Sequence, residues 1–290
     1  MSTLQPLAEL VTIGIATKNR WNDLKITLTQ LVDIGLSNIS VLILDDYSDQ
    51  PCPFEIQSLH PNATIQRFES SEGYICRRNQ LAQRMYTKYY LSLDDDSYPV
   101  AGSLQTVVEF AESHPELFCL SFPIFNPVLN EYQNSSRHNS PYQTRFFIGC
   151  GHLIRRDRLL QLGGYREDLI HQGEEMDIAA RAFQQGFYCY HFPGFEIHHT
   201  ASNVGRNWHR MDFYGARNNV LWNDWFVPVH IKPIKQARTT LSRLSLTMRV
   251  WRLGQLQGML QALKDIPRYQ KYRQPMSSKL YRSWQHLPHS

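Results

Sequence analysis

Three short apolar runs, at residues 11–16, 39–44 and 89–93, constrain the fold of this chain most strongly. Near-continuous apolar runs of this length are typical of strands that a parallel sheet buries on both faces. The segments 23–31 and 75–86, which lie between the runs, repeat apolar residues at helical spacing. This alternation predicts an α/β fold with a mainly parallel, Rossmann-like sheet flanked by helices.

Polar residues follow all three runs at their carboxyl ends. They are Thr17, Asn19 and Arg20 after the first run, Asp45 and Asp46 after the second, and Asp94, Asp95 and Asp96 after the third. Ligands of open α/β sheets bind beyond the carboxyl ends of the strands. We therefore expect a polar crevice along that edge of the sheet.

The run of three acids, Asp94 to Asp96, favours a bound cation. Adjacent carboxylates repel one another, and this repulsion raises their pKa values unless a positive charge offsets it. Hard oxygen ligands of this kind suit Mg²⁺ or Mn²⁺. A solvated acidic turn is the alternative interpretation of these three residues taken alone.

The length and composition are those of a globular protein with a large core. The chain has 290 residues, enough for one sizeable domain or two halves. No run reaches the roughly 20 apolar residues of a membrane-spanning helix, and the N-terminus lacks a signal-peptide pattern. The five cysteines are scattered and have no CxxC spacing, so we expect reduced thiols in a cytoplasmic protein.

The small net charge of +4 hides a strongly basic segment at residues 231–290. This segment holds 12 Lys and Arg and one acid, Asp265, whereas the rest of the chain holds 18 basic and 25 acidic residues. Between 234 and 266 the pattern is amphipathic and includes Trp251 and Leu263. Such a helical tail lies on an anionic membrane surface, packs on the core or forms an oligomer. No nucleic-acid partner is expected, because no recognition motif accompanies the charge.

Seven short motifs, taken in order, resemble the family 2 glycosyltransferases of the GT-A (nucleotide-diphospho-sugar transferase) fold. The motifs are IATKNR, LILDDYSD, EGYICRRNQ, LSLDDDSYP, RRDRLLQLGGYRED, GEEMDIAARAFQQGF and IHHT. The resemblance covers about residues 10–230. It implies a GT-A catalytic domain at 1–230, with a nucleotide-sugar-binding half at about 1–100, an acceptor half at 101–230, and the helical tail at 231–290.

The resemblance implies a metal-dependent, inverting transfer of a sugar from a nucleotide-diphospho-sugar, with UDP- or dTDP-sugars favoured. The acceptor hydroxyl would belong to a glycan or a lipid-linked glycan, in cell-surface polysaccharide or glycolipid synthesis. Two other classes stay open. One is a catalytically silent protein of this fold that binds glycans or acts as a scaffold. The other is a sugar-phosphate nucleotidyltransferase, but its glycine-rich phosphate loop has no counterpart after the first strand.

By resemblance, the donor would be held by polar residues drawn from several motifs. They are Thr17, Asn19, Arg20, Asp45, Asp46, Arg78, Asn79, Asp94, Asp95 and Arg217. Arg78 would approach the pyrophosphate, because a guanidinium matches phosphate geometry, and Arg77 competes with it for this role. Asn79 would lie on the ribose side. For Arg217, the alternative to a place near the donor phosphates is a structural salt bridge.

The same resemblance implies that the metal, Mn²⁺ or Mg²⁺, binds at the DDD motif. Asp94 and Asp96 correspond to the two acids of the family's DxD motif. Asp96 is the first choice for direct contact with the ion, and Asp94 or Asp95 would contact the ribose or act through water. His198 or His199 would complete the metal shell. Strand alternation sends these two side chains to opposite faces, and the sequence does not choose between them.

The GEE motif would supply the general base. The family pattern is G-E-D with the Asp as base, and this chain has Glu175 at that position. The side chain of Glu is one methylene longer, so Glu174 and Asp177 stay open as alternatives. A carboxylate in the first turn of a helix is favoured by the helix dipole. On the acceptor side we expect Gly149, Gly151 and His152, where glycine backbone lets a sugar approach closely.

Overall fold

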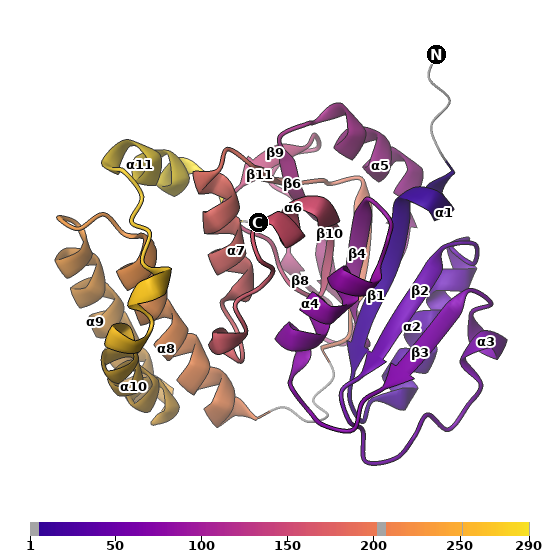
Figure 1. Cartoon of the computed structure of the whole chain (residues 1–290), viewed down its shortest axis with the longest axis horizontal. Coiled ribbons are helices and arrows are strands. Elements are labelled where there is room, and N and C mark those ends of the chain that lie inside the picture. Colours follow the sequence, from indigo (N-terminus) through magenta and orange to yellow (C-terminus); the bar gives the residue numbers. More distant parts are fainter. Residues whose placement is uncertain (1–5, 202–206, 251, 290) are drawn as a thin grey trace.

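The central sheet of the computed structural model has eight strands in the order β3-β2-β1-β4-β10-β6-β11-β9 (Figure 1). The structure describes residues 6–201, 207–250 and 252–289. The strands of this sheet are β1 (Val11–Thr17), β2 (Ser40–Asp45), β3 (Ala63–Arg67), β4 (Tyr89–Asp94), β6 (Leu117–Ser121), β9 (Tyr142–Thr144), β10 (Gly151–Arg155) and β11 (Tyr188–His191). Strand β10 is antiparallel to both β4 and β6, so the sheet is parallel through β3-β2-β1-β4 and mixed beyond.

Helices cover both faces of the sheet, as the alternating pattern predicts. They are α1 (Leu7–Leu10), α2 (Trp21–Asp33), α3 (Ile56–Leu59), α4 (Tyr74–Arg84), α5 (Leu104–Ser113), α6 (Arg156–Gln161), η1 (Glu167–Leu169) and α7 (Glu174–Gln184). The buried residues form two clusters. One packs α1, α2, α3 and α5 against the sheet, and the other packs α4, α6 and α7. The predicted α/β fold with flanking helices is confirmed.

The parallel register places the polar loops together. Thr17 pairs with Asp45 across β1 and β2, and Ala16 pairs with Asp94 across β1 and β4. The carboxyl ends of three neighbouring strands therefore lie at one edge, where the sequence predicts the crevice.

A second sheet extends from the acids themselves. Its order is β5-β12-β7-β8, with β5 (Ser97–Gly102), β12 (Phe195–His199), β7 (Ile124–Asn126) and β8 (Glu131–Asn134). Strand β5 starts directly after Asp96, and β12 pairs antiparallel to it so that His199 lies opposite Ser97. The backbone N–H of Thr200 donates to the carbonyl of Asp96 over 3.1 Å. This sheet brings His198 and His199 next to the DDD motif.

The last third of the chain is helical. It comprises α8 (Trp208–Phe226), α9 (Lys232–Val250), α10 (Gly254–Arg268), η2 (Gln270–Tyr272) and α11 (Ser278–His286), which lie on the α7 side of the sheet (Figure 1). Helix α10 runs close against α8, where Gly254 and Gly258 leave no room for a side chain against the α8 backbone. Tyr281 and Trp284 of α11 are buried in the cluster that contains α7. Trp251 lies outside the described residues.

The segment 231–290 therefore packs on the preceding part of the chain. Arg217 of α8 and Asp265 of α10 form a buried salt bridge with 2.5 Å between Nε and Oδ2. Among the helices that the structure describes, none combines the length and hydropathy that crossing a membrane requires.

Candidate active site

The side chain of Asp95 points into the protein and binds Thr17, at the end of β1, and Arg20, in the loop that follows. Its carboxylate accepts a hydrogen bond from Thr17 Oγ1 at 2.8 Å and lies 2.9 Å from Arg20 Nη1. Burial raises the pKa of Asp95 to about 8, against the opposing charge of Arg20. The guanidinium of Arg20 also bonds Asp96. Thr17 and Arg20, both expected at the donor, thus contact the DDD motif directly.

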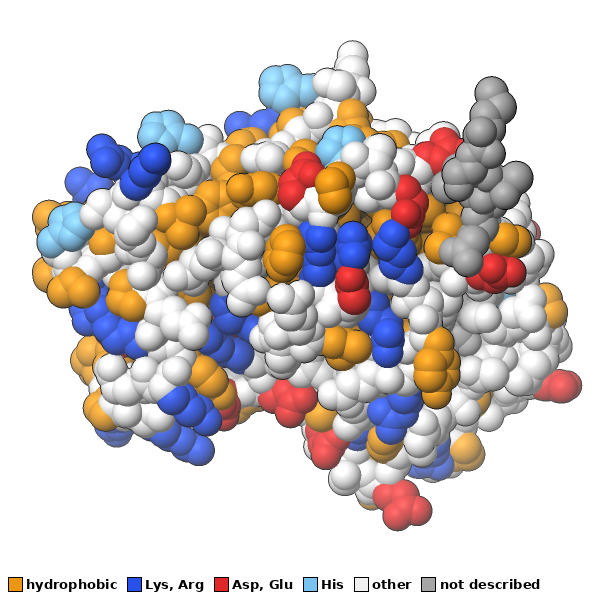
Figure 2. Space-filling model, turned by 45° about the horizontal axis from the view of Figure 1, so that its top comes forward, with side chains coloured by type: hydrophobic (Ala, Val, Ile, Leu, Met, Phe, Trp, Pro, Cys, Tyr) orange, Lys and Arg blue, Asp and Glu red, His pale blue; other side chains and the backbone are white. Residues whose placement is uncertain are grey.

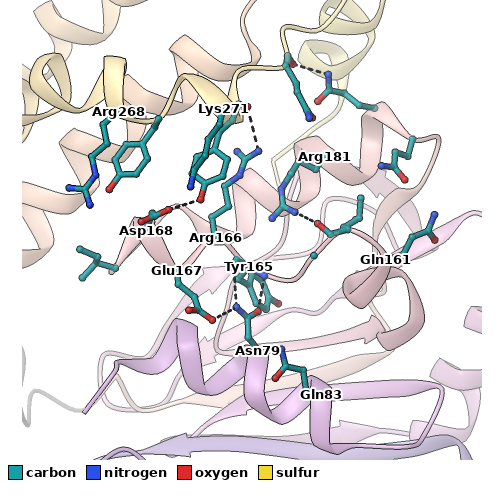
Figure 3. Close-up of a pocket in the computed structure, with 18 residues that line it drawn as sticks. Asn79, Gln83, Gln161, Tyr165, Arg166, Glu167, Asp168, Arg181, Arg268 and Lys271 are labelled. Atoms are coloured by element: carbon teal, nitrogen blue, oxygen red, sulfur yellow. Dashed lines mark hydrogen bonds between the residues drawn. The ribbon is translucent and has the colours of Figure 1, made fainter. Parts of the chain in front are cut away.

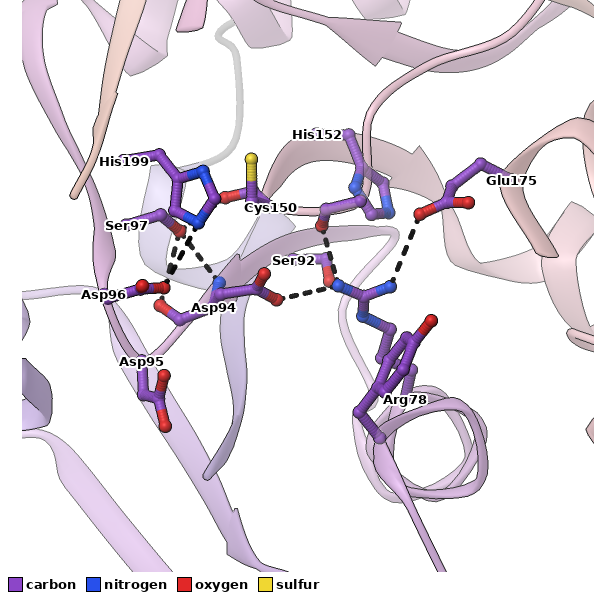
Figure 4. A network of polar contacts seen from close by, with 12 residues as sticks. Arg78, Ser92, Asp94, Asp95, Asp96, Ser97, Cys150, His152, Glu175 and His199 are labelled. Atoms are coloured by element: carbon purple, nitrogen blue, oxygen red, sulfur yellow. Dashed lines mark hydrogen bonds and ion pairs between the residues drawn. The ribbon is translucent and has the colours of Figure 1, made fainter. Parts of the chain in front are cut away.

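Asp94, Asp96 and His199 converge from two strand ends. Their nearest oxygen and nitrogen atoms all lie within 4.8 Å of one another. His199 Nε2 is 3.4 Å from Asp96 Oδ1 (Figure 4). Its Nδ1 is 2.8 Å from Gln133 Oε1. Two carboxylates and one imidazole form a donor set that fits Mn²⁺ or Mg²⁺.

The surroundings of His199 favour the protonated form of its imidazole. Burial lowers the pKa of an imidazole, but the hydrogen bonds to Asp96 and Cys150 outweigh it and raise the pKa of His199 to about 11. A metal ion bound here would replace that proton.

His198 faces away from the acids. Its Nε2 lies 3.7 Å from Glu196 Oε1, and its ring packs between Tyr98 and Phe125 at centroid distances of 6.0 and 5.4 Å. The two histidines therefore lie on opposite faces of β12, and His199 lies on the face that contacts the DDD motif.

Arg78 connects the DDD motif to the GEE motif. It is buried, and its Nη2 donates to Asp94 Oδ1 at 2.7 Å and to the carbonyl of Gly149 at 3.0 Å. Its Nη1 donates to Glu174 Oε1 at 3.1 Å and lies 3.8 Å from Glu175 Oε1 (Figure 4). One guanidinium therefore sets the spacing between the two acidic motifs.

The three candidate bases have different surroundings. Glu174 is buried, and Asp177 is buried between Arg166 at 2.5 Å and Arg181 at 2.9 Å. The side chain of Glu175 is 20% exposed. Burial among protein atoms and the charge of Glu174 raise the pKa of Glu175 well above its usual value, although Arg78 opposes the shift. Glu175 is thus the accessible carboxylate of the three.

Of the expected acceptor residues, Gly149 lies in this network. A Cβ atom at position 149 would overlap Glu175 Oε1 and lie 2.7 Å from Arg78 Nη1. Gly151 instead packs against Ile197, where a Cβ would lie 3.0 Å from the side chain. His152 is buried, its Nε2 lies 3.1 Å from Tyr165 Oη, and burial lowers its pKa far below the usual value.

The acids after β2 hold loops. Asp46 accepts hydrogen bonds from Ser71 Oγ, from the N–H groups of Glu72 and Gly73, and from Arg77 Nε at 2.8 Å. Arg77, the alternative to Arg78 for contact with the pyrophosphate, is buried and bonds Asp46.

The neighbouring Asp45 also binds within the protein. It accepts from the N–H and Oγ of Ser48, and Arg67 Nε lies 3.5 Å away. Asn19 exchanges hydrogen bonds with Asp49. These contacts hold the loops that border the crevice.

Asn79 and Arg217 hold the segment that precedes the GEE motif. The side chain of Asn79 bonds both the N–H and the carbonyl of Tyr165. Arg217 donates to Asp265 and to the carbonyl of Asp168, so the salt-bridge alternative describes its contacts. Among the described residues, the side-chain hydrogen bonds of Asn79 go to Tyr165 and Glu167, and those of Arg217 go to Asp168, Asn218 and Asp265.

Three contributors were not singled out in the sequence. Tyr74 packs its ring 4.8 Å from the Arg78 guanidinium and accepts from the N–H of Gln172. Gln133 orients His199, and Ser97 bonds the carbonyl of Cys150. Tyr74 and Ser97 lie within the EGYICRRNQ and LSLDDDSYP motifs, next to residues that were assigned. Gln133 is brought to the site by the register of the second sheet.

A cavity elsewhere in the molecule does not coincide with this site. It measures about 850 Å³ and lies between α4, residues 161–170 and residues 268–274 (Figure 3). Arg166 and Arg181 line it, but both are already paired with Asp177. We therefore place the chemistry at the polar network of Figure 4 and not in this cavity.

Several solved structures share the fold at 15–17% sequence identity. S. aureus TarS 1-349 in complex with UDP-GlcNAc matches with a TM-score of 0.62 and 15% identity, over 89% of this chain and 80% of that one. The mannosyltransferase PcManGT from Pyrobaculum calidifontis, in complex with GDP-Man and Mn²⁺, matches with 0.57 and 16%, over 94% and 77%. GalNAc-T7 with UDP, GalNAc and Mn²⁺ matches with 0.56 and 17%, over 66% and 44%, so this chain spans less than half of that length.

At the level of sequence, no curated protein matches the chain. The model of the family described as Glycosyl transferase family 2 matches residues 12–170, which is more than half of the chain and includes the DDD motif and Arg78. The chain therefore belongs to glycosyl transferase family 2 and is a glycosyltransferase.

Proposed function

We propose that this protein transfers a sugar from a nucleotide-diphospho-sugar to an acceptor hydroxyl in a metal-dependent reaction that inverts the anomeric centre. The observation that carries the proposal is the double contact of Arg78, which joins Asp94 to Glu174 and approaches Glu175. Metal-binding acids and an accessible base thereby share one site. The complexes of TarS with UDP-GlcNAc and of PcManGT with GDP-Man and Mn²⁺ support this assignment.

Asp94, Asp96 and His199 would hold the ion, and the ion when bound neutralises the charge that develops on the diphosphate leaving group. An imidazole ligand suits Mn²⁺ better than Mg²⁺. Thr17 and Arg20 both bond Asp95, next to the proposed metal ligands. We assign them the role of holding the loop after β1 in place for the donor nucleoside.

Glu175 acts as the general base in this proposal. It accepts the proton of the acceptor hydroxyl as that oxygen bonds to the anomeric carbon. The bond from this carbon to the diphosphate oxygen breaks on the opposite face, and the nucleoside diphosphate leaves with the electron pair. A single displacement of this kind inverts the anomeric centre. NMR of the product tests it, because a retained configuration excludes the direct displacement.

UDP- and dTDP-sugars are the donors we favour, and a glycan or lipid-linked glycan of the cell surface is the acceptor class. We place the reaction in the cytoplasm. All five cysteines are free thiols, and two of the three buried ones, Cys119 and Cys189, lie on neighbouring strands without forming a disulfide. This agrees with a reducing compartment.

Thermal unfolding against a panel of UDP-, dTDP- and GDP-sugars, with and without Mn²⁺, tests the donor site. A ligand at about 100 times its dissociation constant stabilises a protein by roughly 2.7 kcal/mol. We expect a Mn²⁺-dependent shift for one nucleotide, its loss in Asp96→Ala and its persistence in Glu175→Gln. A folded protein that shifts with no nucleotide would instead be a catalytically silent glycan-binding member.

A further inference from the structure

Helix α10 is apolar on two opposite sides. One side, with Gly254, Gly258 and Met259, is buried against α8. The other carries Leu253, Leu260 and Leu263 at spacings of seven and three residues, which places them in one row along the helix. These three leucines, which we call the leucine row, are 52–62% exposed. Burial against α8 does not account for them.

Helix α9, which contacts α10, repeats the feature. Ile234, Leu241 and Met248 recur at every seventh position and are 59–70% exposed. Thr239, on another side of α9, is buried and bonded to Asn223 of α8. Both helices therefore turn one face to α8 and expose a second apolar row. Isolated exposed apolar residues are ordinary, but two rows on adjacent helices indicate a binding surface.

The surroundings of these rows are positively charged. Lys264 is exposed beside the leucine row. Arg268 and Lys271, which also line the cavity of Figure 3, are exposed further along the chain. Asp265, the one carboxylate of residues 231–290, is buried and paired with Arg217. On the left of Figure 2, where the C-terminal helices lie, orange and blue side chains intermingle and red ones are nearly absent. Although Lys232 and Arg273 pair with Asp224, and Arg252 pairs with Asp212, the surface combines apolar contact with an excess of positive charge.

This combination separates two possible occupants. A second copy of the chain would bring the same cations face to face, and like charges across an interface cost free energy. An anionic bilayer supplies the opposite charge to Lys and Arg and an apolar interior to the leucines.

We propose that the exposed rows of α9 and α10 bind an anionic membrane surface, with the leucine row inserted at the boundary between headgroups and acyl chains. The N-terminal end of α10 packs beside Trp208, because Arg252 lies over its ring at 5.5 Å. Trp208 is half exposed and follows His199 by nine residues. If the proposed transfer is correct, this placement suits an acceptor carried by a lipid.

Sedimentation of the full-length protein with vesicles tests the proposal without donor, metal or acceptor, so its outcome is independent of the proposed reaction. We expect binding to vesicles of phosphatidylcholine with phosphatidylglycerol, little binding to phosphatidylcholine alone, and weakening at high salt. The triple variant L253Q/L260Q/L263Q should bind at least tenfold more weakly. The double variant K264Q/R268Q should also lose about tenfold.

The matched control is V128Q/L129Q, which alters two equally exposed apolar residues between β7 and β8. It should bind vesicles like the unchanged protein. Thermal unfolding of each variant establishes that the helices still pack. Equal binding by the folded triple variant and the control would overturn the proposal. The proposal would also be overturned if light scattering showed that the unchanged protein is a dimer and the triple variant a monomer. The rows would then form an interface between two copies of the chain.

Discussion

Gly149 leaves space for the carboxylate of Glu175, because a Cβ atom at position 149 would overlap Glu175 Oε1. The same missing side chain lets the carbonyl of Gly149 accept from Arg78 Nη2 at 3.0 Å. Glu carries one methylene more than the Asp expected in the GEE motif from the family resemblance. In this chain, the absence of a side chain at position 149 accommodates the longer residue.

Gly149→Ala should therefore reduce kcat by about 100-fold, because displacement of a catalytic group by about 1 Å costs this much. Glu175→Asp should also lower kcat when made alone. In the double variant, the shorter Asp no longer meets the new methyl group, so we expect the two losses to be less than multiplicative. Steady-state kinetics of the four proteins measure this coupling. Fully multiplicative losses would mean that the two positions act independently.

Arg78 should also be essential for stability. Its removal leaves Asp94, Glu174 and Glu175 without the cation that separates them, and breaking a buried ion pair costs about 3–5 kcal/mol. We expect Arg78→Ala to lower the free energy of unfolding in urea by about 3 kcal/mol. Arg84→Ala, at the exposed end of the same helix, is the control and should change it by about 0.5 kcal/mol or less. Similar losses in both variants would contradict the role of Arg78.

The raised pKa of Glu175 predicts how the rate depends on pH. A general base works in its ionised form, so kcat/KM should rise with pH and level off only above the raised pKa of Glu175, well above 4.5. Glu175→Gln should remove this rise together with about 10²- to 10⁴-fold of the rate. A rate that is already level near pH 5 would show that the base is a different group.

The same shift has a consequence for stability. Between 4.5 and the raised pKa, the folded protein holds a proton on Glu175 that the unfolded chain has released. The free energy of unfolding should therefore fall as pH rises through this window. The Glu175→Gln variant lacks this group, so its free energy of unfolding should fall less over the same pH window. Urea unfolding at several pH values compares the two proteins, and parallel pH profiles would contradict the shift.

Local patterns were sufficient to predict the strands and the edge of the sheet where the acids lie. The apolar runs predict β1, β2 and β4 because residues of a strand buried on both faces must all be apolar. The parallel order then brings Thr17, Asp45 and Asp94 to one edge. The roles of the acids at that edge depend on partners distant in sequence. Asp46 is bonded by residues 71–77, which reach it through a turn that no periodicity predicts.

The choice between His198 and His199 depended on the register of two strands. A register shift between Glu196 and Ile197 where β12 pairs with β5 decides which histidine faces Asp96. Strand alternation alone gives two faces without saying which one meets the acids. The antiparallel orientation of β10 could not be predicted either, because a buried apolar run does not indicate whether a strand pairs parallel or antiparallel to its neighbours.

The tail should be required for folding. Met276, Tyr281 and Trp284 are buried, and the ring of Trp284 lies 5.2 Å from that of Phe183 and 6.2 Å from that of Trp222. Each large apolar side chain that loses its burial costs about 2 kcal/mol, and a domain has about 5–15 kcal/mol in total. A protein ending at residue 230 should lack a cooperative thermal transition. A truncated protein with an unchanged midpoint would show that residues 231–290 are an independent unit.

The His pair offers a test of the metal site with a built-in control. His199→Ala removes the proposed imidazole ligand beside Asp94 and Asp96, whereas His198→Ala alters the neighbouring residue on the opposite face of the strand. We expect His199→Ala to weaken Mn²⁺ binding, measured by electron paramagnetic resonance of the free ion, by about 10-fold or more. Loss of outer-shell partners alone costs 10- to 100-fold in metal affinity, so loss of a direct ligand should cost at least as much. His198→Ala should bind Mn²⁺ like the unchanged protein. If the two variants bind equally well, the ion is held by the carboxylates without the imidazole.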